Sequence, residues 1–214
     1  MDTGRAPTDE LRIAVMAKAP QAGYAKTRLI PALGAAAAAR LHRELTLRTL
    51  CTALDAGIGS LTLWCAPDTG HRFFRALRRR CCLDLRSQPE LDLGRRMAHA
   101  FAEADGPLLL IGTDCPALSG EHLRRAALGL RSGNDAVFIT TEDGGYLLVG
   151  LNRPRPALFD GIEWSTSGVM QQTRNRMSAL GLRWQEVAQL WDIDRPSDVR
   201  RWKALLRAET ACGA

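Results

Sequence analysis

The sequence lacks the features that mark disulfide-stapled, zinc-stapled or membrane-spanning proteins. Its six cysteines among 214 residues include no C-x-x-C pair, and its four histidines lack zinc-finger spacing, so neither a disulfide framework nor a structural zinc site is expected. No apolar run approaches the roughly 20 residues needed to cross a bilayer. Residues 1–11 contain acids and a proline and no apolar stretch, which predicts a flexible tail and not a signal peptide. A cytoplasmic protein is therefore expected.

Lysine and aromatic residues are also scarce. The net charge is +6, but no aromatic residues alternate with the scattered arginines as a nucleic-acid stacking surface would require, so small phosphorylated ligands are the expected partners. Of the 29 basic residues only Lys18, Lys26 and Lys203 are lysine, and the first two lie within nine residues of each other. Lysine is a compact, rotatable point charge, which sets this window apart from the arginine-rich remainder of the chain.

From residue 12 to residue 210, short apolar runs alternate with helical periodicity, which predicts a single α/β domain. Strands are expected over 13–17, 60–66, 82–86, 107–112 and 135–140, and helices over 34–56, 70–80, 93–104 and 119–131. A strand at 146–151, a helix at 166–180, a strand at 183–188 and a helix at 197–209 follow. This repetition predicts one doubly wound, mostly parallel sheet, whose ligands bind beyond the carboxyl ends of the strands.

The segment AVMAKAPQAGYAKTRL, residues 14–29, predicts a phosphate-binding loop. An apolar strand runs into a loop that contains Pro20 and presents cations and backbone N–H groups to an anion. A surface loop with ordinary solvated charges is the alternative. The nucleotide-binding residues expected from this loop, together with an arginine near the start of a later helix, are Lys18, Gly23, Lys26, Thr27, Arg28 and Arg96.

Three aspartates are candidate ligands of a hard divalent cation. Asp114 follows the buried strand PLLLIG, and Asp192 and Asp194 alternate in WDIDRPSDV, so that both carboxylates would project from one side of an extended segment. The alternatives are structural. Asp114 could be a turn residue or cap the helix that starts near Ser119, and Asp194 or Ser197 could cap the last helix.

A third group of residues is a candidate binding site for the second substrate. The turn TEDGGY favours a β-hairpin, and it leaves two acids and a tyrosine at a strand mouth, where Asp143 could act as a general base. In the step Trp164-Ser165-Thr166, the hydroxyls could cap a helix, and the indole could stack on a ring or pack in the core. The four histidines are assigned no role. The expected acceptor-binding residues are Glu142, Asp143, Gly144, Gly145, Tyr146, Trp164 and Ser165.

The order of motifs AKAP..G..KTRL, LG.RM, GTDCP, DGGYLLVGL, WST and D.DRP.D resembles a bacterial family of nucleotide-diphospho-sugar-transferase-like proteins with the GT-A type fold. At greater distance the chain is similar to nucleotidylyltransferases that make molybdopterin dinucleotide and the phospholactate or phosphoenolpyruvate precursors of the deazaflavin cofactor. The resemblance implies that Lys18, Lys26 and Arg28 hold nucleotide phosphates. It also places the magnesium carboxylates on Asp114, Asp192 and Asp194.

Two positions depart from the family pattern. Residues 139–142 replace a Gly-Pro segment before DGGY, and Arg95 stands where an acid is more usual. Neither change touches the expected phosphate or metal residues, so the acceptor side is where this chain would differ.

The sequence therefore predicts an enzyme that uses Mg²⁺ or Mn²⁺ and a nucleotide-activated donor, with Lys26, Arg28 and Asp143 as catalytic residues. A glycosyltransferase acting from a nucleoside-diphosphate sugar onto a small acceptor is the leading hypothesis. A nucleotidylyltransferase that joins a nucleoside triphosphate to a phosphorylated substrate is the alternative. A nucleotide-binding protein without catalytic activity is a further alternative, although it would have no use for three clustered carboxylates.

Overall fold

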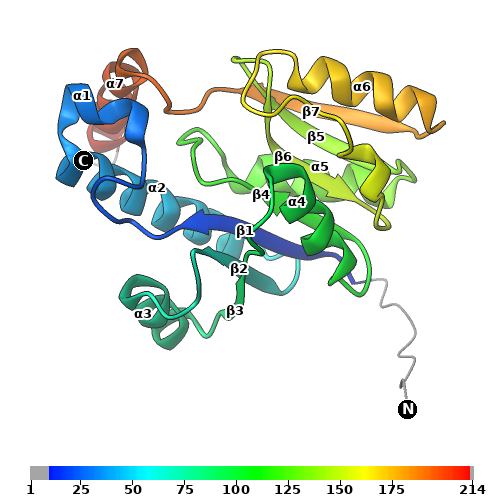
Figure 1. The fold of residues 1–214 in the computed structure, drawn as a ribbon, viewed down its shortest axis with the longest axis horizontal. Coiled ribbons are helices and arrows are strands. Elements are labelled where there is room, and N and C mark those ends of the chain that lie inside the picture. The colour runs from blue at the N-terminus through cyan, green and yellow to red at the C-terminus, as the bar shows by residue number, and fades with distance from the viewer. Residues whose placement is uncertain (1–9, 213–214) are drawn as a thin grey trace.

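A computed structural model describes residues 10–212, in which seven strands form one sheet in the order β3-β2-β1-β4-β6-β5-β7 (Figure 1). Because β4 and β5 both pair antiparallel with β6, and the other neighbours pair in parallel, only β6 runs against the rest. The predicted α/β class and mostly parallel sheet are confirmed. The strands are β1 (Arg12–Lys18), β2 (Leu61–Ala66), β3 (Asp84–Ser87), β4 (Leu108–Ile111), β5 (Ala136–Thr141), β6 (Tyr146–Leu151) and β7 (Trp184–Leu190).

Helices cover both faces of the sheet, because successive side chains of a strand point to opposite faces. In β1, Ile13 and Val15 pack with α2, α3 and α5, whereas Ala14 packs with α4 and α6. The α-helices are α1 (Ile30–Leu33), α2 (Ala35–Asp55), α3 (Arg72–Cys81), α4 (Leu93–Ala102), α5 (Gly120–Arg131), α6 (Val169–Ala179) and α7 (Pro196–Cys212). Two 3₁₀ turns, η1 (Thr27–Leu29) and η2 (Pro156–Leu158), complete the described elements.

A separate apolar cluster joins the start of the chain to its end. Leu29 of η1 and Leu45 of α2 pack with Trp191, Ile193 and, on α7, Trp202. This packing fixes the segment after β7 beside the loop after β1, at one end of the sheet (Figure 1). Two stretches that are far apart in the sequence therefore meet at a single place.

The structure corrects two predicted helix starts. The chain is already helical before Gly34, because Pro31 fits the first turn of α1, where its missing N–H leaves no bond unmade, and Gly34 with φ 78° then separates α1 from α2. At the other site α6 begins at Val169 and not at residue 166. Ser165 has φ 67° and is no N-cap, and the Thr166 hydroxyl accepts from the Gly168 N–H and donates to the Glu163 carbonyl.

Most of the predicted N-terminal tail, residues 1–9, lies outside the described residues. Leu11, which the tail was predicted to include, is 3% exposed and packs in the core. The single domain over 12–210 stays a prediction. Within residues 10–212 no helix is both long and apolar enough to cross a membrane.

Candidate functional site

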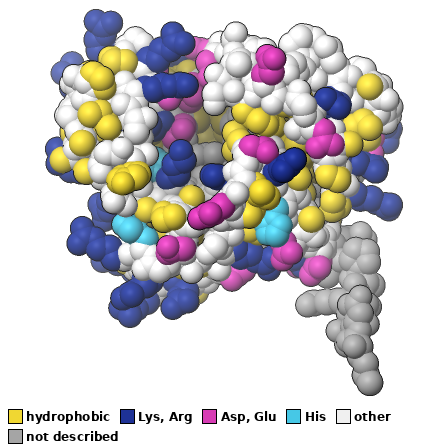
Figure 2. Space-filling model, viewed as in Figure 1, with side chains coloured by type: hydrophobic (Ala, Val, Ile, Leu, Met, Phe, Trp, Pro, Cys, Tyr) yellow, Lys and Arg dark blue, Asp and Glu magenta, His cyan; other side chains and the backbone are white. Residues whose placement is uncertain are grey.

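A cleft of about 540 Å³ opens at the carboxyl ends of β1 and β4. The chain leads from β1 to its neighbour β2 on one side, and from β4 to β5 and β6 on the other side, and in doubly wound sheets such a switch point is where ligands bind. Acidic and basic side chains lie together around the hollow (Figure 2). Of the residues expected from the sequence, those that line the cleft are Lys18, Lys26, Thr27, Arg28, Arg96, Asp114, Asp143, Gly145, Tyr146, Trp164, Ser165, Asp192 and Asp194.

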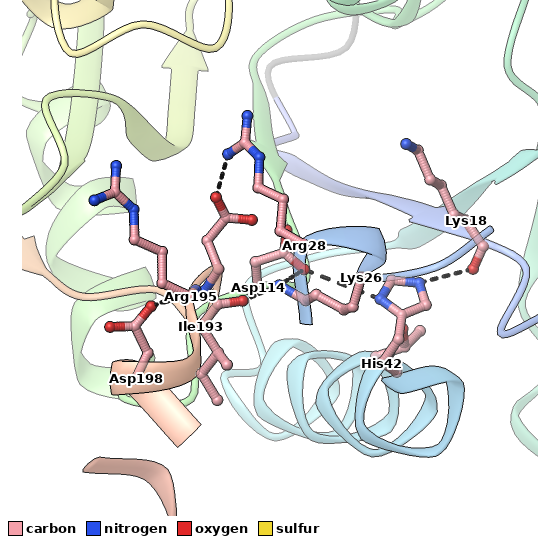
Figure 3. Close-up of polar contacts among 10 residues, drawn as sticks. Lys18, Lys26, Arg28, His42, Asp114, Ile193, Arg195 and Asp198 are labelled. Carbon is pink, nitrogen blue, oxygen red and sulfur yellow. Dashed lines mark hydrogen bonds and ion pairs between the residues drawn. The ribbon is translucent and has the colours of Figure 1, made fainter. Parts of the chain in front are cut away.

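Lys26 is the central cation of the cleft. Its side chain is only 4% exposed, and its ammonium group forms an ion pair with Asp114 Oδ1 at 2.8 Å (Figure 3). The same group donates to the backbone carbonyl of Ile193. Lys26 has φ 51°, a left-handed conformation that turns the loop at this residue. The loop therefore directs Lys26 inward, between the segment after β4 and the segment after β7.

Asp114 follows β4 and faces the cleft with a half-exposed side chain, as predicted for an acid at a strand end. Desolvation acts to raise its pKa, but the charge and hydrogen bond of Lys26 prevail and hold the pKa below its usual range. The alternative of a helix cap is wrong, because Ser119 caps α5 in a reciprocal pair with His122. The Ile193 N–H donates to the Asp114 carbonyl at 2.9 Å, which ties the two segments together.

Asp194 pairs with Arg28, which follows Lys26 in the segment after β1. The hydrogen bond from Arg28 and the attraction between the two charges raise the pKa of Arg28. Neither Asp194 nor Ser197 caps α7. Asp198 in the first turn of α7 instead bonds the chain before the helix, since its Oδ2 accepts from the N–H groups of Asp194 at 3.0 Å and Arg195 at 2.7 Å. The Asp194 carboxylate is therefore free of capping and directed to the loop.

Asp192 differs from the other two aspartates, because no described lysine or arginine forms an ion pair with it. Burial first, and then the charges of Asp143 and Asp114, raise its pKa to about 6. A half-buried carboxylate among other carboxylates favours a cation in its neighbourhood. Of the three candidate metal ligands, Asp192 is thus the one whose carboxylate has no ion pair with a described residue.

His42, for which the sequence predicts no role, lies between Asp114 and the end of β1. It is 5% exposed on α2, and its Nε2 lies 3.0 Å from the Lys18 carbonyl (Figure 3). Desolvation lowers its pKa, which favours neutral imidazole. Its Nδ1 is buried, has no hydrogen-bond partner among the described residues and lies 4.0 Å from Asp114 Oδ1. Helical periodicity marks such a residue only as buried, and nothing local in the sequence shows what it faces.

Within residues 10–212 no three His, Cys, Asp or Glu side chains are arranged to hold a metal ion. Asp114 and Asp194 are instead each paired with a cation of the loop. The donor set nevertheless fits a hard divalent cation, since oxygen ligands are what such ions prefer and Asp192 is uncompensated. The orphaned Nδ1 of His42 beside Asp114 is a second sign of a missing partner.

The side of the cleft where the sequence predicts acceptor binding is formed by the hairpin between β5 and β6. Asp143 Oδ1 accepts from the Thr141 hydroxyl at 2.5 Å and from the Gly145 N–H at 3.1 Å, which orients the carboxylate at the cleft. Tyr146 and Trp164 meet edge to face at 6.3 Å between ring centres. The predicted hairpin is therefore present, and it also carries the expected acid.

Three expected site residues do not line the cleft. Glu142 points elsewhere and pairs with Arg201 at 2.7 Å. Gly144 packs on Ser167, where a Cβ would lie 2.1 Å from the carbonyl oxygen, so this glycine is explained by close packing. Gly23, with φ 89°, turns the loop without reaching the cleft. Their assignment as contact residues stays a prediction, since a local turn signal does not show which way the chain faces.

Trp164 packs against the core, and it also lines the cleft. Its ring packs so closely on α4 that a Cβ on Gly94 would lie 2.8 Å from it. The glycine of the LG.RM motif is thus required by this contact.

Asp192→Asn is expected to stabilise the ligand-free protein at pH 7. Because the pKa in the folded state is above the ordinary value for aspartate, ionisation lowers folding stability as pH rises from about 4 to 6. Asn removes this effect. We expect a gain of about 1 to 2 kcal/mol in the free energy of unfolding, less than the full shift implies because the cleft is partly solvated.

Urea unfolding at pH 4 and pH 7 would measure this gain, with Asp160→Asn on the exposed surface as the control. The gain should be present at pH 7 and absent at pH 4. An equal gain at both pH values, or a loss at pH 7, would show that Asp192 is not an uncompensated carboxylate.

The geometry can now be set beside known proteins. A family model described as "Uncharacterized protein conserved in bacteria (DUF2064)" matches residues 47–166, just over half of the chain. No curated protein matches the sequence significantly. A protein from Desulfovibrio desulfuricans G20, provisionally assigned as a nucleotide-diphospho-sugar transferase, is 28% identical, with a TM-score of 0.78 over 88% of this chain and 84% of its own.

Two more distant structures share the fold. CMP:2-keto-3-deoxy-manno-octonic acid synthetase in complex with CTP is 13% identical, with a TM-score of 0.62 over 94% of this chain and 99% of its own. Glucosyl-3-phosphoglycerate synthase from Mycobacterium tuberculosis, in complex with Mn²⁺, UDP and glucosyl-3-phosphoglycerate, is 10% identical. Its TM-score is 0.54 over 89% of this chain and 74% of its own.

Proposed function

This chain belongs to the bacterial DUF2064 family, and from that premise we propose that it is a Mg²⁺- or Mn²⁺-dependent glycosyltransferase that uses a nucleoside-diphosphate sugar and a small acceptor. The observation that carries the proposal is the pairing of loop cations with strand-end aspartates, Lys26 with Asp114 and Arg28 with Asp194, at the switch point of the sheet. The similarity to a nucleotide-diphospho-sugar transferase fold supports it.

The donor's diphosphate would lie against the loop after β1. Lys18 is exposed at the end of β1, and Arg28 reaches the same cleft from η1. Lys26 and Arg28 are paired with aspartates in the free protein, and in the complex they would also contact the phosphates. These cations then stabilise the negative charge that develops on the diphosphate as it leaves, which is how such a loop would contribute to rate.

A divalent cation would be held by Asp114 and Asp192, with Asp194 as a further carboxylate of the set, and would supply positive charge opposite the leaving diphosphate. Mn²⁺ accompanies UDP in glucosyl-3-phosphoglycerate synthase, which supports metal use by a neighbour with this fold. Pairing of Asp114 and Asp194 with Lys26 and Arg28 would neutralise their charge until the cation binds.

The acceptor would bind on the hairpin side of the cleft. Asp143 is oriented by Thr141 and Gly145 through one oxygen, and no described residue donates to the other. Asp143 is therefore placed to take the proton of an acceptor hydroxyl as that oxygen attacks the sugar carbon. Trp164 and Ser165 border the same region, where an indole can pack against a sugar ring.

A nucleotidylyltransferase is the second candidate. A basic loop that neutralises phosphates serves this reaction equally well, and the structural neighbour with a TM-score of 0.62 is a synthetase in complex with CTP. In that case a substrate phosphate would attack the α-phosphorus and pyrophosphate would leave. The two reactions share the donor half of the cleft and differ in which nucleotide form binds well.

A thermal-shift panel tests the proposal. UDP-, GDP-, ADP- and dTDP-sugars are compared with CTP, GTP and ATP, each with Mg²⁺ and with EDTA. A ligand at 100 times its Kd stabilises by about 2.7 kcal/mol, or roughly 5 to 10 °C for a chain of this size. We expect this shift for at least one nucleotide-sugar and its reduction by EDTA. A response to triphosphates alone would favour nucleotidyl transfer, and no response to any member at millimolar concentration would contradict both.

A further inference from the structure

Gln88 is a buried polar side chain in the cleft that the roles described above do not use. It follows β3, is 8% exposed and lines the cleft on the side away from the hairpin. Its Nε2 donates to the Trp64 carbonyl at 2.9 Å and to the Ala17 carbonyl at 3.3 Å. Its backbone N–H donates to the Cys65 carbonyl at 2.9 Å. The carboxamide is thus held across the ends of three neighbouring strands.

This bonding fixes the orientation of the amide. Two backbone carbonyls can accept only from the NH₂ group, so Oε1 must point the other way. No residue within 10–212 donates to Oε1. The atom is also not fully enclosed, since the fully buried side-chain atoms without a partner do not include it. The side chain therefore presents one rigid, unused acceptor to the cleft. A polar group that is both buried and prearranged in this way is suited to recognising a ligand's N–H.

The surroundings of Gln88 narrow the chemistry of that ligand. Met16 of β1 and Met97 of α4 line the same cleft, and so does Leu93, which is 45% exposed although it is apolar. A sugar would need several polar partners, whereas these side chains offer apolar contact and one acceptor. A flat ring with N–H donors at its edge matches both features.

The distance from Gln88 to the predicted phosphate-binding residues also suits a nucleotide. The Gln88 amide lies over β1 and β2, and Asp114 follows β4 on the other side of β1. Neighbouring strands are about 4.8 Å apart, so the two groups are separated by roughly two strand spacings, about 10 Å. A nucleotide that has its phosphates at Lys26 can place its base near Gln88.

We infer that Gln88 reads the nucleobase of the donor, with Oε1 accepting from an N–H on the base edge and with Met16, Leu93 and Met97 bordering the ring. This inference rests on the proposed use of a nucleotide donor. Gln88 then determines which base is preferred, and the base subsite is separate from the cations that hold the phosphates.

The test compares nucleoside monophosphates with ribose 5-phosphate, which has a hydroxyl group in place of the base. Calorimetry on wild type should show tighter binding of the preferred monophosphate. In Gln88→Met, which keeps the length and removes the acceptor, that monophosphate should bind about three- to tenfold more weakly, while ribose 5-phosphate should bind as before. Gln171→Met, on the exposed face of α6, is the matched control.

A purely structural role for Gln88 would weaken both ligands equally, and unchanged base preference in Gln88→Met would overturn the inference while leaving the proposed function intact. Failure of wild type to bind any nucleotide would instead contradict the proposed function. If Gln88→Met does not fold, the preferred nucleotide methylated at its edge nitrogen can be titrated into wild type. The methylated form should bind about three- to tenfold more weakly, and equal binding would overturn the inference.

Discussion

Asp114→Asn is expected to abolish the metal dependence of nucleotide binding and to lower turnover by roughly 10²- to 10³-fold. Asp114 is the residue at which the loop, α2 and the segment after β7 converge, since its carboxylate pairs with Lys26 at 2.8 Å and lies 4.0 Å from His42, and its carbonyl accepts from the Ile193 N–H. Asn has the same shape but no charge. Loss of one prearranged electrostatic contact to developing charge has an effect of this size in other enzymes.

The stability of the Asp114→Asn variant should change in the opposite direction from that of Asp192→Asn. Lys26 would lose its ionic partner while its side chain remains 4% exposed, so we expect a loss of about 1 to 2 kcal/mol in the free energy of unfolding. Melting temperature and a Mg²⁺ titration of nucleotide binding should be measured on the same samples, with Asp160→Asn as the control. A Mg²⁺ response equal to that of wild type would show that Asp114 holds no metal.

Lys26→Met is expected to weaken nucleotide binding by roughly tenfold to a hundredfold. Methionine keeps much of the apolar stem and removes the ammonium group, so the change isolates the charge. A charge-assisted hydrogen bond contributes about 1.5 to 3 kcal/mol, which corresponds to this range of affinity. The free protein should also lose stability, because Asp114 and the Ile193 carbonyl both lose the group that bonds them.

Lys203→Met, at an exposed position on α7, is the matched control and should change neither property. The comparison must be made on affinity as well as on melting temperature, because a loss of stability alone would fit a structural lysine. If Lys26→Met binds nucleotide as tightly as Lys203→Met, the loop after β1 does not hold the phosphates.

Most elements could be predicted from local patterns. The short apolar run that forms the buried strand β1 and the Ser119 cap of α5 follow from hydrophobic patterning and capping chemistry, which depend on residues a few positions apart. The predicted boundaries fail where the backbone leaves ordinary conformations, as at Ser165, whose φ of 67° no cap signal foretells. Local patterns likewise mark a turn such as Asp143-Gly144 without showing which of its residues face the cleft.

The partners of the charged residues could not be predicted in this way. The sequence predicts three aspartates that repel one another, whereas in the structure Lys26 pairs with Asp114 and Arg28 with Asp194, and only Asp192 is left uncompensated. Lys26 and Ile193 are 167 residues apart and meet because the cluster of Leu29, Trp191 and Trp202 draws the two segments together.

The sequence by itself determined the α/β elements, the cationic loop after the first strand and the acids at the strand ends, because each depends on neighbouring residues. Only the tertiary structure decided that β4 lies beside β1, that His42 faces Asp114, and that the Gln88 amide is held by two carbonyls from other strands. These contacts arise from strand order and helix packing, which join residues distant in the chain. Burial then makes the unpaired Nδ1 of His42 significant, since enclosed polar atoms are normally satisfied.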